Sequence, residues 1–365
     1  MWAMPVNQLS LEQRVCCANL LFRSANFLHL KTLLNSWYRW DSGQFTHIAL
    51  YGYDASWRMA FFPLFPLLEG ALTVVVRDPF VAGLLISNVV TLGMFMVLYK
   101  LVAEDFDAER AWRTVLYLAV FPTAFFFAAA YNESLFLFFA LLSFYYMRKG
   151  RWWLAALAAL GASLTRSIAV CLFIPFAYEY LRQRDFQWRR INFSVLSCVG
   201  MVGGVVIFMI YGYLAFHDPL AFSHAQAAWQ RQLTFPWKVF TEAYYIIRHT
   251  PILTFESIHT VMDLSAILFI LVVLILAFVG PWKLAREHWS YAFYAVAIYL
   301  FVILVPEGGG LPLSSLGRFM LEIFPVFVVL AAIGQKRNFN VYYLSICLPL
   351  LAFMLLQWLT GGWIV

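Results

Sequence analysis

Charged residues are scarce in this chain: Asp, Glu, Lys and Arg make up only 12% of its 365 residues, against about a quarter in soluble domains. Hydrophobic residues make up 63%. A water-soluble fold could not cover so much apolar surface. The apolar residues form blocks of about 15 to 24, and about 20 are needed to cross the hydrocarbon core of a bilayer. The composition therefore predicts an all-α polytopic membrane protein.

Several sequence signals of common activities are also missing. The chain has no Walker A loop, GxSxG elbow, HExxH motif or GxGxxG turn, so ATP-driven transport and the common soluble-site chemistries lose support. It has no basic tail or interleaved aromatic platform for nucleic acid, and the net charge of +6 comes from short Lys and Arg clusters between apolar blocks. The five cysteines show no metal-ligand spacing, and no DxD-type pair lies near Asp41. We therefore expect no nucleic-acid partner and no metal, and we interpret the cysteines as packing residues.

The apolar blocks predict about ten transmembrane helices. They cover residues 80–99, 114–130, 132–147, 153–165, 167–180, 193–215, 261–280, 289–306, 318–334 and 341–364. The block 60–77 is different, because Pro63, Pro66 and Glu69 interrupt it, and it is predicted to be an interfacial or re-entrant helix. The predicted organisation is an N-terminal segment and first outer loop (1–79), followed by a helical bundle (80–365) that includes an outer loop at 216–260.

Basic clusters indicate the orientation of these helices. They lie at Lys100 to Arg113, Arg148 to Arg151, Arg182 to Arg190, Lys283 to His288 and Lys336-Arg337. All fall on one side if two helices, rather than one long helix, lie between residues 151 and 182, with a turn near Arg166. The positive-inside rule makes that side cytoplasmic. The other face then carries residues 1–79, the Tyr131 to Glu133 turn, Arg166, the loop 216–260 and residues 307–318.

The densest polar and aromatic stretch runs from Trp37 to Asp54 and includes Trp40, Asp41 and His47. Its aromatic rings suit a helix at the headgroup level of the membrane. A carboxylate at that boundary can act as general base on the hydroxyl of a lipid-anchored acceptor, which makes Asp41 a candidate catalytic residue. The alternative is a helix N-cap, because Asp41 precedes a helix-like run.

Ionisable groups also stand at the outer ends of predicted helices. Asn132 with Glu133, Arg166 and Arg318 lie on the same face as Asp41. Such groups are costly in hydrocarbon and usually face a cavity or a partner. The guanidinium fork matches phosphate oxygens, so the arginines are candidates for binding a lipid phosphate. A snorkelling anchor or a structural ion pair is the alternative for each.

The outer loop holds a second set of candidate substrate contacts. Trp229 can stack on the apolar face of a sugar, while Gln226 and Arg231 can bond to sugar hydroxyls or phosphate. The alternative is an amphipathic surface helix over residues 222–231.

These segments, taken in order, resemble one known family. They are Trp40-Asp41, Ile48-Ala49, Gly52-Tyr53, Phe61 to Pro66, Pro122 with Tyr131 to Phe136, Ser163 to Arg166, and Gln226 to Trp229 with Pro236. The combination resembles the PIG-V-type mannosyltransferases, which comprise the second mannosyltransferase of glycosylphosphatidylinositol-anchor assembly and its prokaryotic relatives. The resemblance runs from about residue 37 to residue 334, most of the chain, and it is the ordered combination that carries it.

The resemblance implies a C-type glycosyltransferase (GT-C) fold. Such an enzyme uses a polyprenyl-phosphate sugar, commonly mannose, as donor, needs no further cofactor, and inverts the anomeric carbon. Asp41 would deprotonate the hydroxyl of a lipid, glycan or protein acceptor, and Arg166 or Arg318 would stabilise the departing lipid phosphate. The short length suggests a prokaryotic member in the plasma membrane, with its site outside the cytoplasm.

One departure from the family concerns the N-terminus. Enzymes of this fold have a transmembrane helix before the catalytic loop, whereas Val15 to Leu30 is broken by Arg23, Ser24 and Asn26, and no cleavable signal peptide is visible. Either that first helix is missing or the segment lies on the outer surface. Two other functions stay open: a transporter or lipid flippase, and an inactive relative with a scaffold role. Polar groups gathered at outer helix ends, rather than at mid-span, favour the enzyme.

Overall fold

The computed structural model describes residues 34–251, 254–306 and 316–361, apart from the side chains of Trp229, Phe255 and Glu256. Within these ranges the regular elements are helices, and no strand occurs. The predicted all-α fold is confirmed. The N-terminal stretch that was expected to lack a transmembrane helix, Cys16, Cys17 and residues 307–315 lie outside the described residues.

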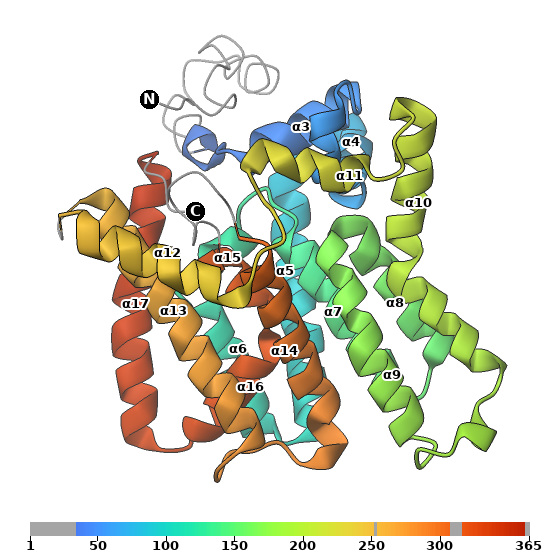
Figure 1. The fold of residues 1–365 in the computed structure, drawn as a ribbon, viewed down its shortest axis with the longest axis vertical. Coiled ribbons are helices and arrows are strands. Elements are labelled where there is room, and N and C mark those ends of the chain that lie inside the picture. Colours follow the sequence, from blue (N-terminus) through green and yellow to red (C-terminus); the bar gives the residue numbers. More distant parts are fainter. Residues whose placement is uncertain (1–33, 252–253, 307–315, 362–365) are drawn as a thin grey trace.

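Helices that run along the long axis of the molecule form the bundle (Figure 1). In chain order they are α5 (Pro79–Asp105), α6 (Ala108–Ala119), α7 (Glu133–Arg148), α8 (Trp152–Thr165), α9 (Phe173–Arg182), α10 (Val199–Phe216), α13 (Phe255–Phe278), α14 (Trp289–Leu304), α16 (Phe324–Ile333) and α17 (Arg337–Leu359). Sequence signals mark where they begin. The Asp78 carboxylate, for example, accepts from the N–H of Val81 (3.0 Å) and Pro79 starts the first turn, so α5 has an N-cap of the expected kind.

Five helices among the described residues are long and apolar enough to cross a membrane by length and composition. They are α5, α10 with the 3₁₀ turn before it, α13, α14 and α17, and a sixth is possible if one bent pair counts as a single span. Helices α7 (16 residues) and α8 (14 residues) lie where they were predicted but are shorter than these five helices. Helix α9 begins only at Phe173, because a 3₁₀ turn occupies the start of the predicted segment 167–180. The predicted number of about ten transmembrane helices is therefore not confirmed, although the positions of most predicted segments are.

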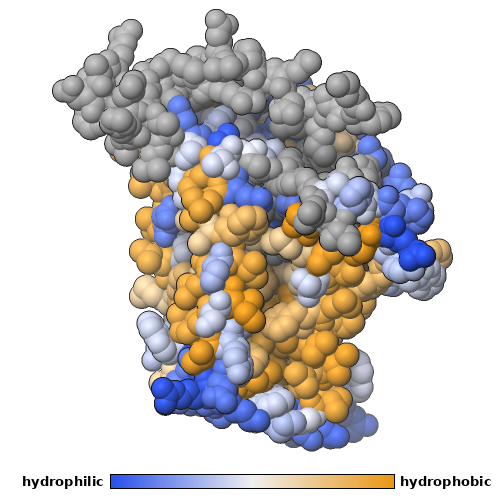
Figure 2. All heavy atoms as spheres, turned by 90° about the vertical axis from the view of Figure 1, so that its left-hand side faces the viewer, coloured by the Kyte–Doolittle hydropathy of each residue, from blue (hydrophilic) through white to orange (hydrophobic). Residues whose placement is uncertain are grey.

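The basic loops lie together at one end of the bundle. The loops that join α9 to α10, α13 to α14 and α16 to α17 meet at the lower end of Figure 1. The short helices α3 (Asp41–Tyr51), α4 (Leu64–Val76) and α11 (Ala221–His224) lie across the opposite end. Figure 2 shows apolar side chains over the middle of one face and hydrophilic side chains at its lower end. The arrangement is that of a protein with an apolar belt between two polar ends.

The predicted helix over residues 114–130 is wrong in its second half. Helix α6 ends at Ala119, and Pro122 follows, because proline cannot continue a helix. The chain then crosses the bundle as irregular backbone with a short 3₁₀ turn, η4 (Ala124–Phe127), whose four side chains are all buried. Backbone of this kind is tolerated at membrane depth where it is buried in protein.

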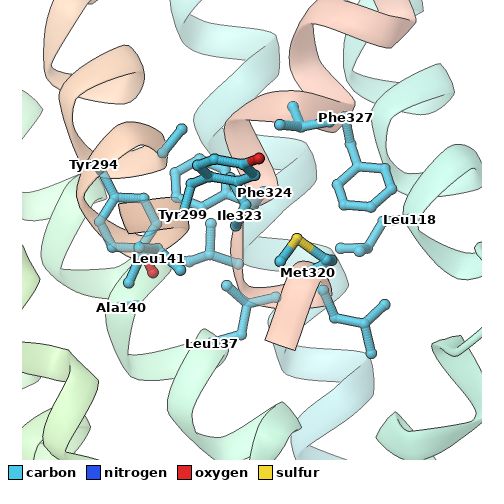
Figure 3. Close-up of a cluster of buried hydrophobic side chains, with 14 of the residues drawn as sticks. Leu118, Leu137, Ala140, Leu141, Tyr294, Tyr299, Met320, Ile323, Phe324 and Phe327 are labelled. Atoms are coloured by element: carbon cyan, nitrogen blue, oxygen red, sulfur yellow. The ribbon is translucent and has the colours of Figure 1, made fainter. Parts of the chain in front are cut away.

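The segment 318–334 is likewise not one straight helix. It is divided into α15 (Leu316–Phe319), the 3₁₀ turn η10 (Met320–Glu322) and α16, with a bend of 77° at Ile323. Figure 3 shows why the bend is stable: Met320, Ile323 and Phe324 lie in a cluster of apolar side chains contributed by neighbouring helices. Pro325 occupies the start of α16, where a missing N–H costs nothing.

The segment 60–77, predicted to be an interfacial or re-entrant helix interrupted by Pro63, Pro66 and Glu69, instead contains one continuous helix, α4. A 3₁₀ turn, η3 (Ser56–Ala60), precedes α4, whose N-cap is Pro63 and whose first turn contains Pro66. The two prolines therefore start the helix rather than end it. Glu69 is fully buried and accepts from the Thr46 hydroxyl (2.8 Å), which joins α4 to α3.

Candidate active site

A cavity of about 460 Å³ opens at the end of the bundle that α3 and α11 cross. Its polar lining includes Asp41, Asn132, Arg166, Gln226, Arg231 and Arg318. Its apolar lining includes side chains of α3, η3, η5 (Ser167–Leu172), α10, α11 and α14, and of the loops beside them. Seven of the ten predicted site residues, namely these six and Trp40, therefore border one space.

Asp41 is the first residue of α3 rather than its N-cap. Trp40 holds the N-cap position, with φ of 38°, and no side chain caps the helix. The Asp41 carboxylate instead accepts a hydrogen bond from the Arg318 guanidinium, Nη1 to Oδ2, at 2.7 Å. The capping alternative for Asp41 is therefore wrong. The negative charge in the first turn still suits the positive end of the helix dipole.

The left-handed backbone at Trp40 is held by packing and hydrogen bonds from distant elements. A non-glycine residue with positive φ is costly, so its surroundings must fix it. The Trp40 ring lies 4.7 Å from that of Trp358 on α17, and the Tyr131 hydroxyl accepts from the Asp41 N–H (3.3 Å) while donating to the Arg39 carbonyl (3.1 Å). Helix α17 and the turn before α7 thus set the direction of Asp41.

An alternating chain of charges lies behind Asp41. Arg318 Nε is 3.0 Å from the Glu133 carboxylate, and Arg166 Nη1 donates to the same carboxylate oxygen at 3.0 Å. Arg166 also lies 2.7 Å from Glu322 Oε1. Side-chain exposure falls from 22% at Asp41 to 11–12% at the arginines and to 1% or less at the two glutamates. The structural ion-pair alternative therefore holds for both arginines, which nevertheless border the cavity.

Phe319 lies at the centre of three guanidinium groups. The guanidinium carbon of Arg166 is 4.8 Å from the ring centroid, and those of Arg231 and Arg318 are each 5.3 Å away. The face of an aromatic ring attracts cations, so one apolar side chain gathers the three arginines at the cavity wall. They come from α15, from the turn after α8 and from the loop after η8 (Ala225–Trp229).

The other predicted residues fall into different places. Asn132 is buried and donates from Nδ2 to the Thr165 carbonyl (3.0 Å), which fixes the turn carrying Arg166. Gln226 lines the cavity from η8, so the surface-helix alternative does not hold for that residue. The side chain of Trp229 lies outside the described residues.

His47 does not belong to the cavity. Its Nε2 lies 2.9 Å from the Asp54 carboxylate, which also accepts from Arg58 at 3.0 Å. Slight burial raises the pKa of Asp54, but the hydrogen bond with His47 and the charge of Arg58 outweigh it, and the pKa lies below its usual value. The prediction of His47 as a substrate contact is corrected to a surface ion pair that holds the loop after α3.

Sequence reasoning missed Glu322 and Trp358. Glu322 was hidden in an apolar block, although a carboxylate four residues after Arg318 in such a block is itself a signal of a buried partner. Trp358 lies 318 residues beyond Trp40 in sequence, and nothing local shows that the two rings pack together. Among the described residues, no group of three or more His, Cys, Asp or Glu side chains could hold a metal ion.

Known proteins resemble both the sequence and the fold. The dolichyl-phosphate-mannose-protein mannosyltransferase family matches residues 62–213. A GPI alpha-1,6-mannosyltransferase 2 of Rattus norvegicus is 30% identical over 151 residues, which is 38% of this chain and 30% of the relative.

The solved structures extend the likeness to most of the bundle. ArnT from Cupriavidus metallidurans bound to undecaprenyl phosphate has a TM-score of 0.53 at 16% identity, over 86% of this chain and 60% of that one. The structure of ArnT from the same organism in the apo state has a TM-score of 0.51 at 15% identity, over 86% of this chain and 59% of that one. The chain thus resembles mannosyltransferases of the PIG-V type in part of its sequence and GT-C glycosyltransferases in its fold. The fold class and the family resemblance are thus confirmed, while the chain spans about a third of the curated relative and about three fifths of the solved GT-C structures.

Proposed function

We propose that this chain is a membrane glycosyltransferase that moves a hexose, with mannose the expected sugar, from a polyprenyl-phosphate-linked donor to the hydroxyl of a lipid, glycan or protein acceptor. The GT-C likeness and the undecaprenyl phosphate bound to the ArnT relative support the donor class. The proposed location is the prokaryotic plasma membrane, with the cavity outside the cytoplasm, because the basic loops lie at the opposite end.

One observation carries the proposal: a carboxylate and three guanidinium groups border the same cavity, Asp41 with Arg166, Arg231 and Arg318. A transfer with inversion needs a base for the incoming hydroxyl and positive charge for the leaving phosphate. Asp41 can serve as the base and the arginines can supply the positive charge, because all four border the same cavity.

The proposed reaction is a single displacement. The acceptor oxygen forms a bond to the anomeric carbon while the bond from that carbon to the phosphate oxygen breaks. The acceptor proton passes to Asp41, and the bonding electrons leave with the phosphate. One negative charge therefore moves from the carboxylate to the phosphate, where Arg318 and Arg166 can stabilise it.

The test is transfer from polyprenyl-phosphate mannose by the purified protein, measured as release of polyprenyl phosphate. Asp41→Asn keeps the shape of the side chain but removes the base, and we expect a loss of about a hundredfold or more in rate. Asp54→Asn is the matched control, since Asp54 lies on the same face but pairs with Arg58 outside the cavity. Full activity of Asp41→Asn would rule out the mechanism.

A further inference from the structure

Asp41 is paired with Arg318, one of the three arginines that border the cavity. Its Oδ2 accepts from Arg318 Nη1 at 2.7 Å, and its side chain is the most exposed of the three carboxylates in the cluster. Glu133 and Glu322 contact the arginines from the protein interior, and neither borders the cavity. An anion that enters the cavity therefore meets Asp41, not a glutamate, as the carboxylate it can replace.

The charges of the cluster leave little room for an additional anion. Among the described residues, Arg166 and Arg318 are paired with three carboxylates, those of Asp41, Glu133 and Glu322, so the positive charge of these two arginines is already neutralised. A phosphodiester brings one more negative charge into a half-buried site, where repulsion is weakly screened. Binding is favourable if the phosphate takes over a guanidinium and the displaced carboxylate turns away from it.

We propose that the donor phosphate and the Asp41 carboxylate compete for Arg318, so that binding of the donor releases Asp41 to act as the base. This inference rests on the proposed function and specifies how its site is regulated. In the unliganded enzyme Arg318 holds the Asp41 oxygen that would take the proton. Arg318 then changes partner from carboxylate to phosphate, and the glutamates behind it keep its position. Productive binding is consequently ordered, with donor before acceptor.

If the two anions compete, the substitution that abolishes transfer should strengthen binding of the lipid phosphate. Asp41→Asn removes the competing charge, so the inactive variant should bind farnesyl phosphate about three- to tenfold more tightly than the unchanged enzyme. Calorimetric titration in detergent measures this without any transfer reaction. Asp54→Asn removes the same charge from the same face without touching Arg318, and its affinity should stay unchanged.

Titrations with two further ligands show which chemical group competes with Asp41. Farnesol, which has the isoprenoid tail but no phosphate, should bind both proteins equally. Inorganic phosphate tests the headgroup without the tail, and we expect no measurable binding to either protein. A gain for inorganic phosphate as large as that for farnesyl phosphate would overturn the assignment to a lipid phosphate.

A double-mutant cycle separates competition at Arg318 from a general effect of charge. In an Arg318→Gln background the gain from Asp41→Asn should disappear, and Arg318→Met, which also removes the positive charge, serves the same purpose if the glutamine variant does not fold. Unchanged or weaker binding by Asp41→Asn, or a gain that persists without Arg318, would overturn the inference. Failure of the proposed function would appear differently, as absence of transfer by the unchanged enzyme from any polyprenyl-phosphate hexose.

Discussion

At the scale of residues, the two buried glutamates differ in how many guanidinium groups they neutralise. Glu133 lies 3.0 Å from both Arg166 and Arg318, whereas Glu322 pairs, within the part of the chain that the structure describes, only with Arg166. Leaving a buried charge without its partner is strongly destabilising, more so than never burying the pair. The two positions therefore offer a graded test of how the cluster is held together.

We expect Glu133→Gln to lower the free energy of unfolding by about 3 kcal/mol and Glu322→Gln by about half as much. The glutamine keeps the volume of the side chain, so the loss reports the charge. Thermal unfolding of the purified variants in detergent measures the difference, with Glu109→Gln as control because that side chain is 82% exposed. An equal loss at Glu133 and Glu322 would contradict the charge chain as described.

At the scale of elements, α8 and α10 approach closely at two glycines of α10. A Cβ atom on Gly200 would lie 2.4 Å from the Ala156 carbonyl oxygen, and one on Gly204 would lie 2.4 Å from the Leu164 nitrogen. The four-residue spacing puts both on one helix face, the small-residue arrangement that lets membrane helices pack backbone to backbone. This contact matters for the site because α8 ends at Thr165, directly before Arg166.

Alanine at Gly200 or Gly204 should therefore force the two helices apart and cost about 1–3 kcal/mol of stability each. Gly203→Ala is the matched control, since its Cβ would meet only the tip of Leu160, at 3.1 Å, and that side chain can move. Thermal unfolding checks the order of the three variants. A loss at Gly203 as large as at Gly204 would contradict the inference that the close approach of α8 at Gly200 and Gly204 sets the cost.

At the scale of the whole molecule, the basic loops lie at one end and the cavity at the other. If the positive-inside rule sets the orientation, Lys149 is cytoplasmic and Gln230 faces the outside. Single cysteines at these exposed positions, in a chain whose five native cysteines are replaced, report their side of the membrane.

We expect a membrane-impermeant maleimide added to intact cells to label Gln230→Cys and to leave Lys149→Cys unlabelled until the membrane is opened. The control is a permeant maleimide, which should label both. Labelling of Lys149→Cys in intact cells would invert the proposed orientation and place the cavity in the cytoplasm.

Much of this molecule could be predicted because apolar blocks and helix signals are local. The turn near Arg166, the start of α5 and the boundaries of α7 follow from residues within a few positions of each feature. The two errors, at 114–130 and 318–334, arose where apolar composition continues through a bend. Apolar composition predicts that a segment is buried. The direction of the backbone at these two bends depends instead on the side chains that pack around them.

The candidate site divides in the same way. The sequence by itself determined a membrane protein with Asp41 and two arginines on one face, because charges in an apolar chain must be placed at its polar ends or paired. Only the tertiary structure decided that Arg318 pairs with Asp41 across 277 positions, that Glu322 belongs to the cluster, and that His47 does not. Ion pairs and cavities bring together residues that are far apart in sequence, and the packing of the helices determines which residues these are.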